Sequence, residues 1–192
     1  MQRIKSYIPR QIKDKIKSSL KLKENSSQLT IYPDDTFLVA YPKSGSTWLG
    51  YLLANYLSNN QCDMVTRNFW IPDLHVHKDW SKIQRPRYIK SHKPFTSEYP
   101  KVVYLVRDPR SVAVSYYFHC RKFYQISKNL SFKEYLHKFN DGSLNDFLSW
   151  NEHVLSWVNN STYNFLLVKY EDLQENTRQE FLKILNFLNL DI

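Results

Sequence analysis

Short apolar runs alternate along the chain with longer segments whose apolar residues recur at helical spacing. The runs at 36–41, 102–106 and 165–168 are rich in aliphatic and aromatic residues, which predicts buried strands. Residues 87–91 form a fourth candidate strand. Residues 59–86 show no clear period and are expected to be irregular.

Helices are expected between and after these strands. The first is marked by a periodic apolar run: Trp48, Leu49, Leu52, Leu53 and Tyr56. Others are predicted after Pro109 through Tyr117, near 131–139, near 144–159 and around 181–188. Because short buried strands alternate with helices, we expect an α/β fold with a parallel β-sheet that helices flank on both faces.

The N-terminal segment has a different character. Its apolar residues repeat at every fourth position: Ile4, Ile8, Ile12, Ile16 and Leu20. Residues 1–23 hold eight cations and one anion, a net charge of +7 out of +9 for the chain. We therefore predict a basic amphipathic helix and linker over 1–28, followed by one domain over 29–192. This helix either packs on the domain or contacts a membrane surface or a partner.

Composition limits the class of protein. With 192 residues, 42% of them hydrophobic and 23% charged, the chain suits a single globular domain. No run approaches the roughly 18 apolar residues of a membrane span, and no export signal is recognised at the start, so a cytoplasmic location is expected. Beyond residue 23 the net charge is only +2, which disfavours specific binding of nucleic acid.

Cysteine and histidine do not suggest a metal site. Cys62 and Cys120 are too few for a disulfide framework and are not spaced as zinc ligands. His75 and His77 lie near Asp73 and Asp79, but without a cysteine partner or an HExxH frame we interpret them as surface polar residues. No metal is predicted.

The first motif with clear chemistry follows the first strand. The turn at 42–47 contains Lys43 and Gly45 among hydroxyl side chains, and it opens a helix. Free backbone N–H groups at such a turn bind anions, and glycine allows a phosphate to approach closely. The frame GxxxxGK[ST] of ATP-binding loops does not fit, since Lys43 precedes Gly45, which disfavours a kinase.

Two further motifs end other strands. Arg107 follows the strand at 102–106, and Ser115 lies about two helical turns later, so both are candidates to bind a second phosphate. Taken alone, Arg107 could instead pair with Asp108 or Asp172. His92, with Lys90 two residues before it, ends the strand at 87–91 and is a candidate base at the same sheet edge.

In this order the motifs resemble those of the cytosolic-type sulfotransferases, which transfer the sulfuryl group of 3'-phosphoadenylyl sulfate (PAPS) to an acceptor. The 5'-phosphosulfate loop of that family is similar to YPKSGSTW here, and its 3'-phosphate motif to LVRDPRSVAVSYY. The segment bearing its catalytic histidine resembles KSHKPF, and a strand and turn beside the adenine resemble LLVKYEDL. The resemblance extends over residues 36–190 and implies a P-loop-like three-layer sandwich.

The resemblance also implies roles. Lys43 would bind the 5'-phosphosulfate and stabilise the leaving oxygen, His92 would deprotonate the acceptor, and Lys90 would stabilise the sulfuryl group in transit. The other implied cofactor contacts are Ser44, Gly45, Ser46 and Thr47 as hydrogen-bond donors, Trp48 and Tyr170 at the adenine, and Arg107 and Ser115 on the 3'-phosphate. The acceptor would be a small molecule, glycan or lipid with a hydroxyl or amine group, and no metal is implied.

The chain departs from the family at its end. Members usually continue to a stretch that closes over the 3'-phosphate and the acceptor, so we expect an incomplete C-terminal part. A truncated relative that binds PAPS or its product PAP with little turnover is therefore the alternative to an active enzyme. The identity of the acceptor and the oligomeric state are left open.

Overall fold

A computed structural model describes residues 29–63, 66–160 and 164–191. The basic helix predicted over 1–28 lies outside the described residues. The core of the rest is a parallel four-stranded sheet in the order β2-β1-β3-β4. Its strands are β1 (Thr36–Ala40), β2 (Tyr88–Ser91), β3 (Val102–Val106) and β4 (Phe165–Lys169). The four predicted strands are thus all present and all run in one direction.

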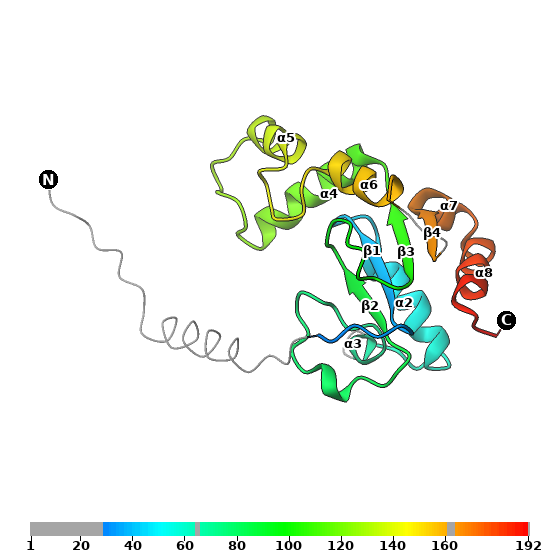
Figure 1. The fold of residues 1–192 in the computed structure, drawn as a ribbon. Helices are drawn as coiled ribbons and strands as arrows, with labels where there is room; N and C mark the ends of the chain where they lie inside the picture. Colours follow the sequence, from blue (N-terminus) through cyan, green and yellow to red (C-terminus); the bar gives the residue numbers. More distant parts are fainter. Residues whose placement is uncertain (1–28, 64–65, 161–163, 192) are drawn as a thin grey trace, which may run out of the picture.

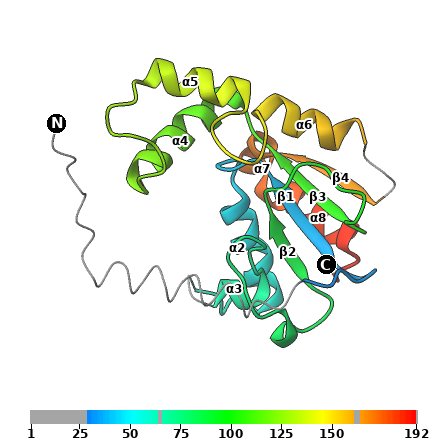
Figure 2. The same ribbon diagram turned by 60° about the vertical axis from the view of Figure 1, so that its left-hand side comes forward.

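Helices flank both faces of this sheet, as predicted (Figures 1 and 2). They are α2 (Ser46–Leu57), α3 (Arg67–Trp70), α4 (Pro109–Lys122), α5 (Phe132–Asp141), α6 (Trp150–Val158), α7 (Tyr170–Glu175) and α8 (Thr177–Leu188), with a short 3-10 helix at Trp80–Lys82. Both views place α4 and α5 side by side, at the end of the molecule away from α3. None of the helices in the described ranges is long and apolar enough to cross a membrane.

Alternation along β1 divides the core into two layers. Leu38 and Ala40 pack with residues of α2 and α8, while Phe37 and Val39 pack on the other face with Trp157 of α6. Because every β1 side chain is buried, the strand reads as a continuous apolar run rather than an alternating one. A third cluster joins α4 to α5 through buried tyrosines such as Tyr116 and Tyr135.

Helix boundaries differ from the sequence prediction in two places. The predicted helix near 144–159 is wrong at its start, because α6 begins only at Trp150. Ser149 and Glu152 form a reciprocal capping box there, and this local hydrogen bonding sets the first turn. Helix α4 continues five residues beyond Tyr117 to Lys122, where basic residues in its last turn complement the helix dipole.

Candidate functional site

The three motifs meet in one cleft at the carboxyl edge of the sheet. Because β1 lies between β2 and β3, the segments that follow these strands are neighbours. The cleft has a volume of about 710 Å³. The residues predicted from the sequence as site residues that line this cleft are Lys43, Gly45, Ser46, Thr47, Trp48, Lys90, His92, Arg107, Ser115 and Tyr170. Of the predicted site residues only Ser44 does not line it.

The turn between β1 and α2 has an unusual backbone. Lys43 and Gly45 both have positive φ angles, 71° and 97°, so the chain reverses sharply before α2 begins at Ser46. No side chain caps the N-terminus of α2, and its first turn contains no acidic residue. The helix therefore presents its positive end to the cleft, which favours an anion at this position.

Two polar atoms near this turn are buried without a hydrogen-bond partner in the described part of the chain. They are the Oγ atom of Ser44, whose residue is 0% exposed, and the Nε atom of Arg107. Buried polar groups are almost always hydrogen-bonded, so the Arg107 atom, whose residue lines the cleft, is expected where a ligand supplies the partner. Ser44 does not line the cleft, and its N–H donates to the Tyr41 carbonyl at 3.2 Å within the turn.

Arg107 is held by its neighbours but is not neutralised. One of its Nη atoms donates to the Lys43 carbonyl at 3.3 Å, and its guanidinium lies 4.2 Å from the centre of the Tyr170 ring. Pairing with Asp108 does not occur, because that carboxylate binds Arg110 at 2.8 Å. Within the described ranges no carboxylate forms an ion pair with Arg107. The guanidinium charge is therefore available to an anion in the cleft.

Positive charge gathers around Lys43. Burial lowers the pKa of Lys43, and the nearby charges of Lys90 and Arg107 lower it further. Cations placed this close repel one another and are stabilised when a polyanion lies between them. This end of the cleft is thus suited to phosphate or sulfate groups.

Aromatic rings form the side of the cleft next to the turn. Trp48 and Tyr170 meet edge to face with ring centres 5.6 Å apart. Both line the cleft, one from the start of α2 and the other from the start of α7. A planar base could stack against such rings.

Gly45 has no room for a side chain. A Cβ atom there would lie 2.4 Å from a ring carbon of Tyr170, and the φ of 97° would strain any other L-residue. We predict that Gly45→Ala will destabilise the fold by about 1–3 kcal/mol and displace Tyr170 from the cleft wall. The matched control is Gly50→Ala in α2, where a Cβ would meet its nearest neighbour at an ordinary 3.5 Å. Thermal unfolding should show a lower Tm for Gly45→Ala only; equal Tm values would contradict the strain.

The part of the cleft that follows β2 is built around His92. Its Nδ1–H donates to the Ala40 carbonyl at 2.6 Å, since a carbonyl can only accept. This fixes the tautomer and leaves a lone pair on Nε2. Burial lowers the pKa of His92 below its usual value, and the Lys90 charge lowers it further, so the ring is neutral near pH 7. A neutral imidazole with a free Nε2 can act as a base.

Three residues in this part of the cleft were not identified as site residues from the sequence. Asp73 binds Lys90, with its Oδ2 atom 2.7 Å from Nζ, and both side chains are largely buried. His75 Nε2 accepts the His92 backbone N–H at 3.0 Å, and the two rings lie nearly parallel with centres 5.7 Å apart. Phe147 packs against both histidine rings. His75 is exposed, in line with the prediction of a surface polar residue, and both Asp73 and His75 also line this cleft.

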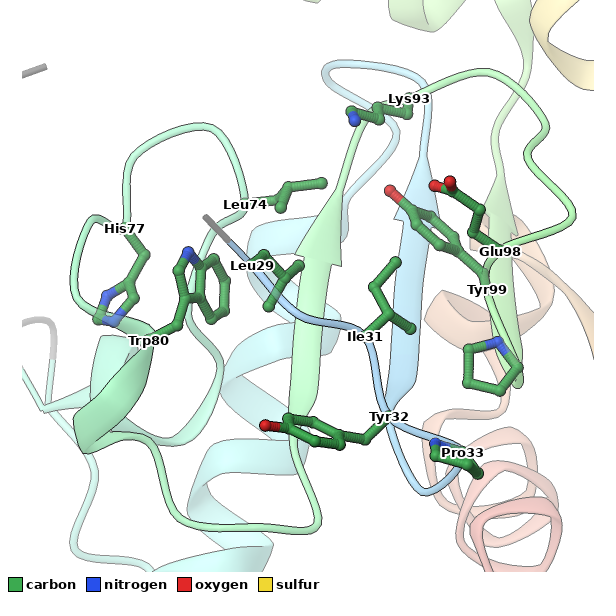
Figure 3. Close-up of a pocket in the computed structure, with 11 residues that line it drawn as sticks. Leu29, Ile31, Tyr32, Pro33, Leu74, His77, Trp80, Lys93, Glu98 and Tyr99 are labelled. Carbon is green, nitrogen blue, oxygen red and sulfur yellow. The ribbon is translucent and has the colours of Figure 1, made fainter. Parts of the chain in front are cut away.

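The described residues hold no cluster of three or more histidine, cysteine or acidic side chains suited to a metal. His77 lies outside the cleft and lines a second cavity of about 820 Å³ over β1 and β2. Figure 3 shows this cavity between Leu29, Trp80 and Tyr99. None of the predicted site residues lines it, so the chemistry of the three motifs belongs to the first cleft.

The sequence of the chain is similar to that of known proteins. The family described as "Sulfotransferase domain" matches residues 33–192. Sulfotransferase 1E1 of Bos taurus is 34% identical over 183 residues, which cover 85% of this chain and 62% of the relative. Sulfotransferase 2A1 of Homo sapiens is 32% identical over 181 residues, which cover 87% and 63%. The chain thus spans less than two thirds of the length of these curated relatives.

Solved structures give the same result for the fold. Mouse sulfotransferase SULT7A1 complexed with PAP superposes with a TM-score of 0.65 at 28% identity, covering 91% of this chain and 65% of that one. Retinol dehydratase in complex with androsterone and inactive cofactor PAP gives the same TM-score at 25% identity, covering 90% and 64%. In both cases the matched protein extends beyond the part shared with this chain.

Proposed function

Because the chain belongs to the sulfotransferase family, we propose that it transfers the sulfuryl group of PAPS to a hydroxyl or amine of an acceptor. The observation that carries this proposal is that one cleft holds both an anion site and a base. Lys43, Arg107 and the free N-terminus of α2 supply positive charge after β1 and β3, and a neutral His92 with its Nε2 lone pair follows β2. A donor anion and an acceptor hydroxyl need these two environments side by side.

The residues present fit the donor nucleotide. The turn from Lys43 to Thr47 would hold the 5'-phosphosulfate, and Gly45 leaves the backbone open to it. Arg107, whose Nε atom lacks a partner, would bind the 3'-phosphate together with Ser115. Trp48 and Tyr170 would hold the adenine. That the solved relative SULT7A1 contains PAP supports this assignment.

When bound, PAPS supplies an activated sulfuryl group that passes to the acceptor oxygen or nitrogen while the 5'-phosphate oxygen departs. His92 would take the acceptor proton on Nε2, because its Nδ1 already donates to Ala40. Lys43 would stabilise the negative charge that develops on the departing oxygen. Lys90 would stabilise the sulfuryl oxygens, and its ion pair with Asp73 would hold the ammonium group in place.

The alternative is a relative that binds PAPS or PAP with little turnover. The observation behind it is that the chain spans 62% of the length of Sulfotransferase 1E1 of Bos taurus. The main proposal includes a small-molecule, glycan or lipid acceptor. It also includes a cytoplasmic location, in keeping with the free thiols of Cys62 and Cys120.

Calorimetric titration with PAP and then with ADP tests the nucleotide site. PAP carries its second phosphate on the 3'-oxygen, where Arg107 should bind it, whereas ADP carries its second phosphate in the 5'-diphosphate. We expect PAP to bind about 10–100-fold more tightly than ADP, since a charge-assisted hydrogen bond contributes about 1.5–3 kcal/mol. Arg107→Gln should remove most of this preference. The matched control Arg110→Gln, an exposed arginine outside the cleft, should keep it.

Each outcome separates the hypotheses. A preference for PAP together with PAPS turnover supports the enzyme, and the same preference without turnover against a panel of phenols, alcohols and amines supports the binding relative. ADP bound as tightly as PAP would contradict the assignment of Arg107. Tighter binding of Mg-ATP than of PAP would favour a kinase instead.

A further inference from the structure

The backbone of His92 is held by a second histidine from a distant part of the chain. His153 of α6 is 0% exposed, and its Nε2 atom lies 3.1 Å from the His92 carbonyl oxygen. The other ring nitrogen, Nδ1, lies 2.9 Å from the hydroxyl of Tyr104, which is also 0% exposed. A continuous chain of hydrogen bonds therefore runs from Tyr104 in β3 through His153 to His92.

The partners determine where each proton lies. The His92 carbonyl can only accept, so Nε2 of His153 must carry a hydrogen. A neutral imidazole then has its lone pair on Nδ1, which accepts the Tyr104 O–H. Burial lowers the pKa of His153 to about 4, so the ring is neutral near pH 7 and this single tautomer satisfies both of its partners.

His92 forms hydrogen bonds at three points, by its Nδ1–H to Ala40, by its N–H to His75 and by its carbonyl to His153. The three partners come from different segments: Ala40 from β1, His75 from the segment before β2, and His153 from α6. The His153 hydrogen bond therefore sets the orientation of the peptide that carries the His92 side chain.

We propose that His153, with Tyr104 behind it, is a positioning residue that aims the Nε2 atom of His92 at the acceptor. This inference rests on the proposed function, in which His92 is the base. His153 does not line the cleft and would touch neither nucleotide nor acceptor. Its effect on the reaction would pass through the hydrogen bond to the His92 backbone.

Trp157 provides a matched control for a purely structural role. It lies one turn further along α6, is 2% exposed, and donates its indole N–H to the Lys93 carbonyl at 3.1 Å. His153→Phe removes the N–H donor to the His92 carbonyl, and Trp157→Phe removes the N–H donor to the carbonyl of the next residue, Lys93. Only the first of these carbonyls belongs to the base.

The first test is steady-state kinetics of the full chain with PAPS and a phenol or alcohol that it turns over. We expect His153→Phe to lower kcat about 100-fold, the size of effect that a small misplacement of a catalytic group produces. The KM for PAPS and the affinity for PAP should stay unchanged. His153→Gln, which offers an amide N–H near the position of Nε2, should recover most of kcat, and Trp157→Phe should leave kcat within about threefold of wild type.

The second test does not depend on turnover. Histidine ¹⁵N NMR of the wild-type chain should show His153 protonated on Nε2, and His153→Phe should shift the ring signals of His92 while Trp157→Phe leaves them in place. If His153→Phe does not fold, Tyr104→Phe takes its place, because this substitution changes the side-chain volume little. It should also shift the ring signals of His92. A proton on Nδ1 of His153, unchanged His92 signals or equal kcat losses in the Phe and Gln variants would overturn the inference. A wild-type chain without turnover would count against the proposed function, and the NMR result would still decide the role of His153.

Discussion

Replacing His92 by alanine is expected to reduce sulfuryl transfer by about 10²–10⁴-fold while PAP affinity changes by no more than about twofold. The reason is that Lys43 and Arg107, which would bind the donor, follow β1 and β3, whereas His92 follows β2. The His92 Nδ1–H donates to Ala40, which leaves Nε2 for the acceptor. In the proposed arrangement no phosphate contact depends on His92.

The measurement combines single-turnover kinetics with calorimetric binding of PAP. His77→Ala is the matched control, because His77 lies in the second cavity and should have wild-type kinetics. The lowered pKa of His92 means that the base is already unprotonated at neutral pH, so raising the pH above neutral should not increase wild-type turnover through deprotonation of His92. Loss of PAP binding equal to the loss of turnover would show that His92 is not confined to the acceptor.

The sequence predicted the strands and the motif positions well, because both depend on local signals. Val102–Val106 is an apolar run of fixed length, and the residues that follow a parallel strand reach the same sheet edge as those that follow its neighbours. Parallel strands therefore predict that Lys43, His92 and Arg107 meet at this edge. The residue types indicate an anion site and a base there.

The contacts that tune these groups could not be predicted in this way. Lys90 and Asp73 are 17 residues apart, and His153 and His92 are 61 apart. Such pairs depend on how segments between the elements pack, and no local period records that packing. The motif also groups Ser44 with Lys43 and Gly45, but the Ser44 side chain is buried and does not line the cleft.

Replacing Lys43 by alanine is expected to reduce both turnover and nucleotide affinity, by about 10²–10³-fold in kcat and about tenfold or more in PAPS binding. Lys43 lies in the turn just before the N-terminus of α2. Its ammonium group would contact the 5'-phosphosulfate in the ground state and the departing oxygen in the transition state. Both states would therefore lose a charge-assisted contact. At a φ of 71° the left-handed backbone conformation is about as unfavourable for alanine as for lysine. The substitution therefore removes the charge without altering backbone strain.

Two further variants separate charge from packing. Lys43→Met keeps the aliphatic stem and should behave as Lys43→Ala, while Lys82→Ala, an exposed lysine paired with Asp79, should leave kinetics and binding unchanged. The comparison with His92→Ala carries the most information. Since Lys43 would meet the nucleotide and His92 the acceptor, only Lys43→Ala should weaken PAPS binding, although both variants lose turnover. If the two variants bound PAPS equally well, Lys43 would not contact the donor in the ground state, and the positive end of the cleft would have to act through Arg107 and the α2 N-terminus alone.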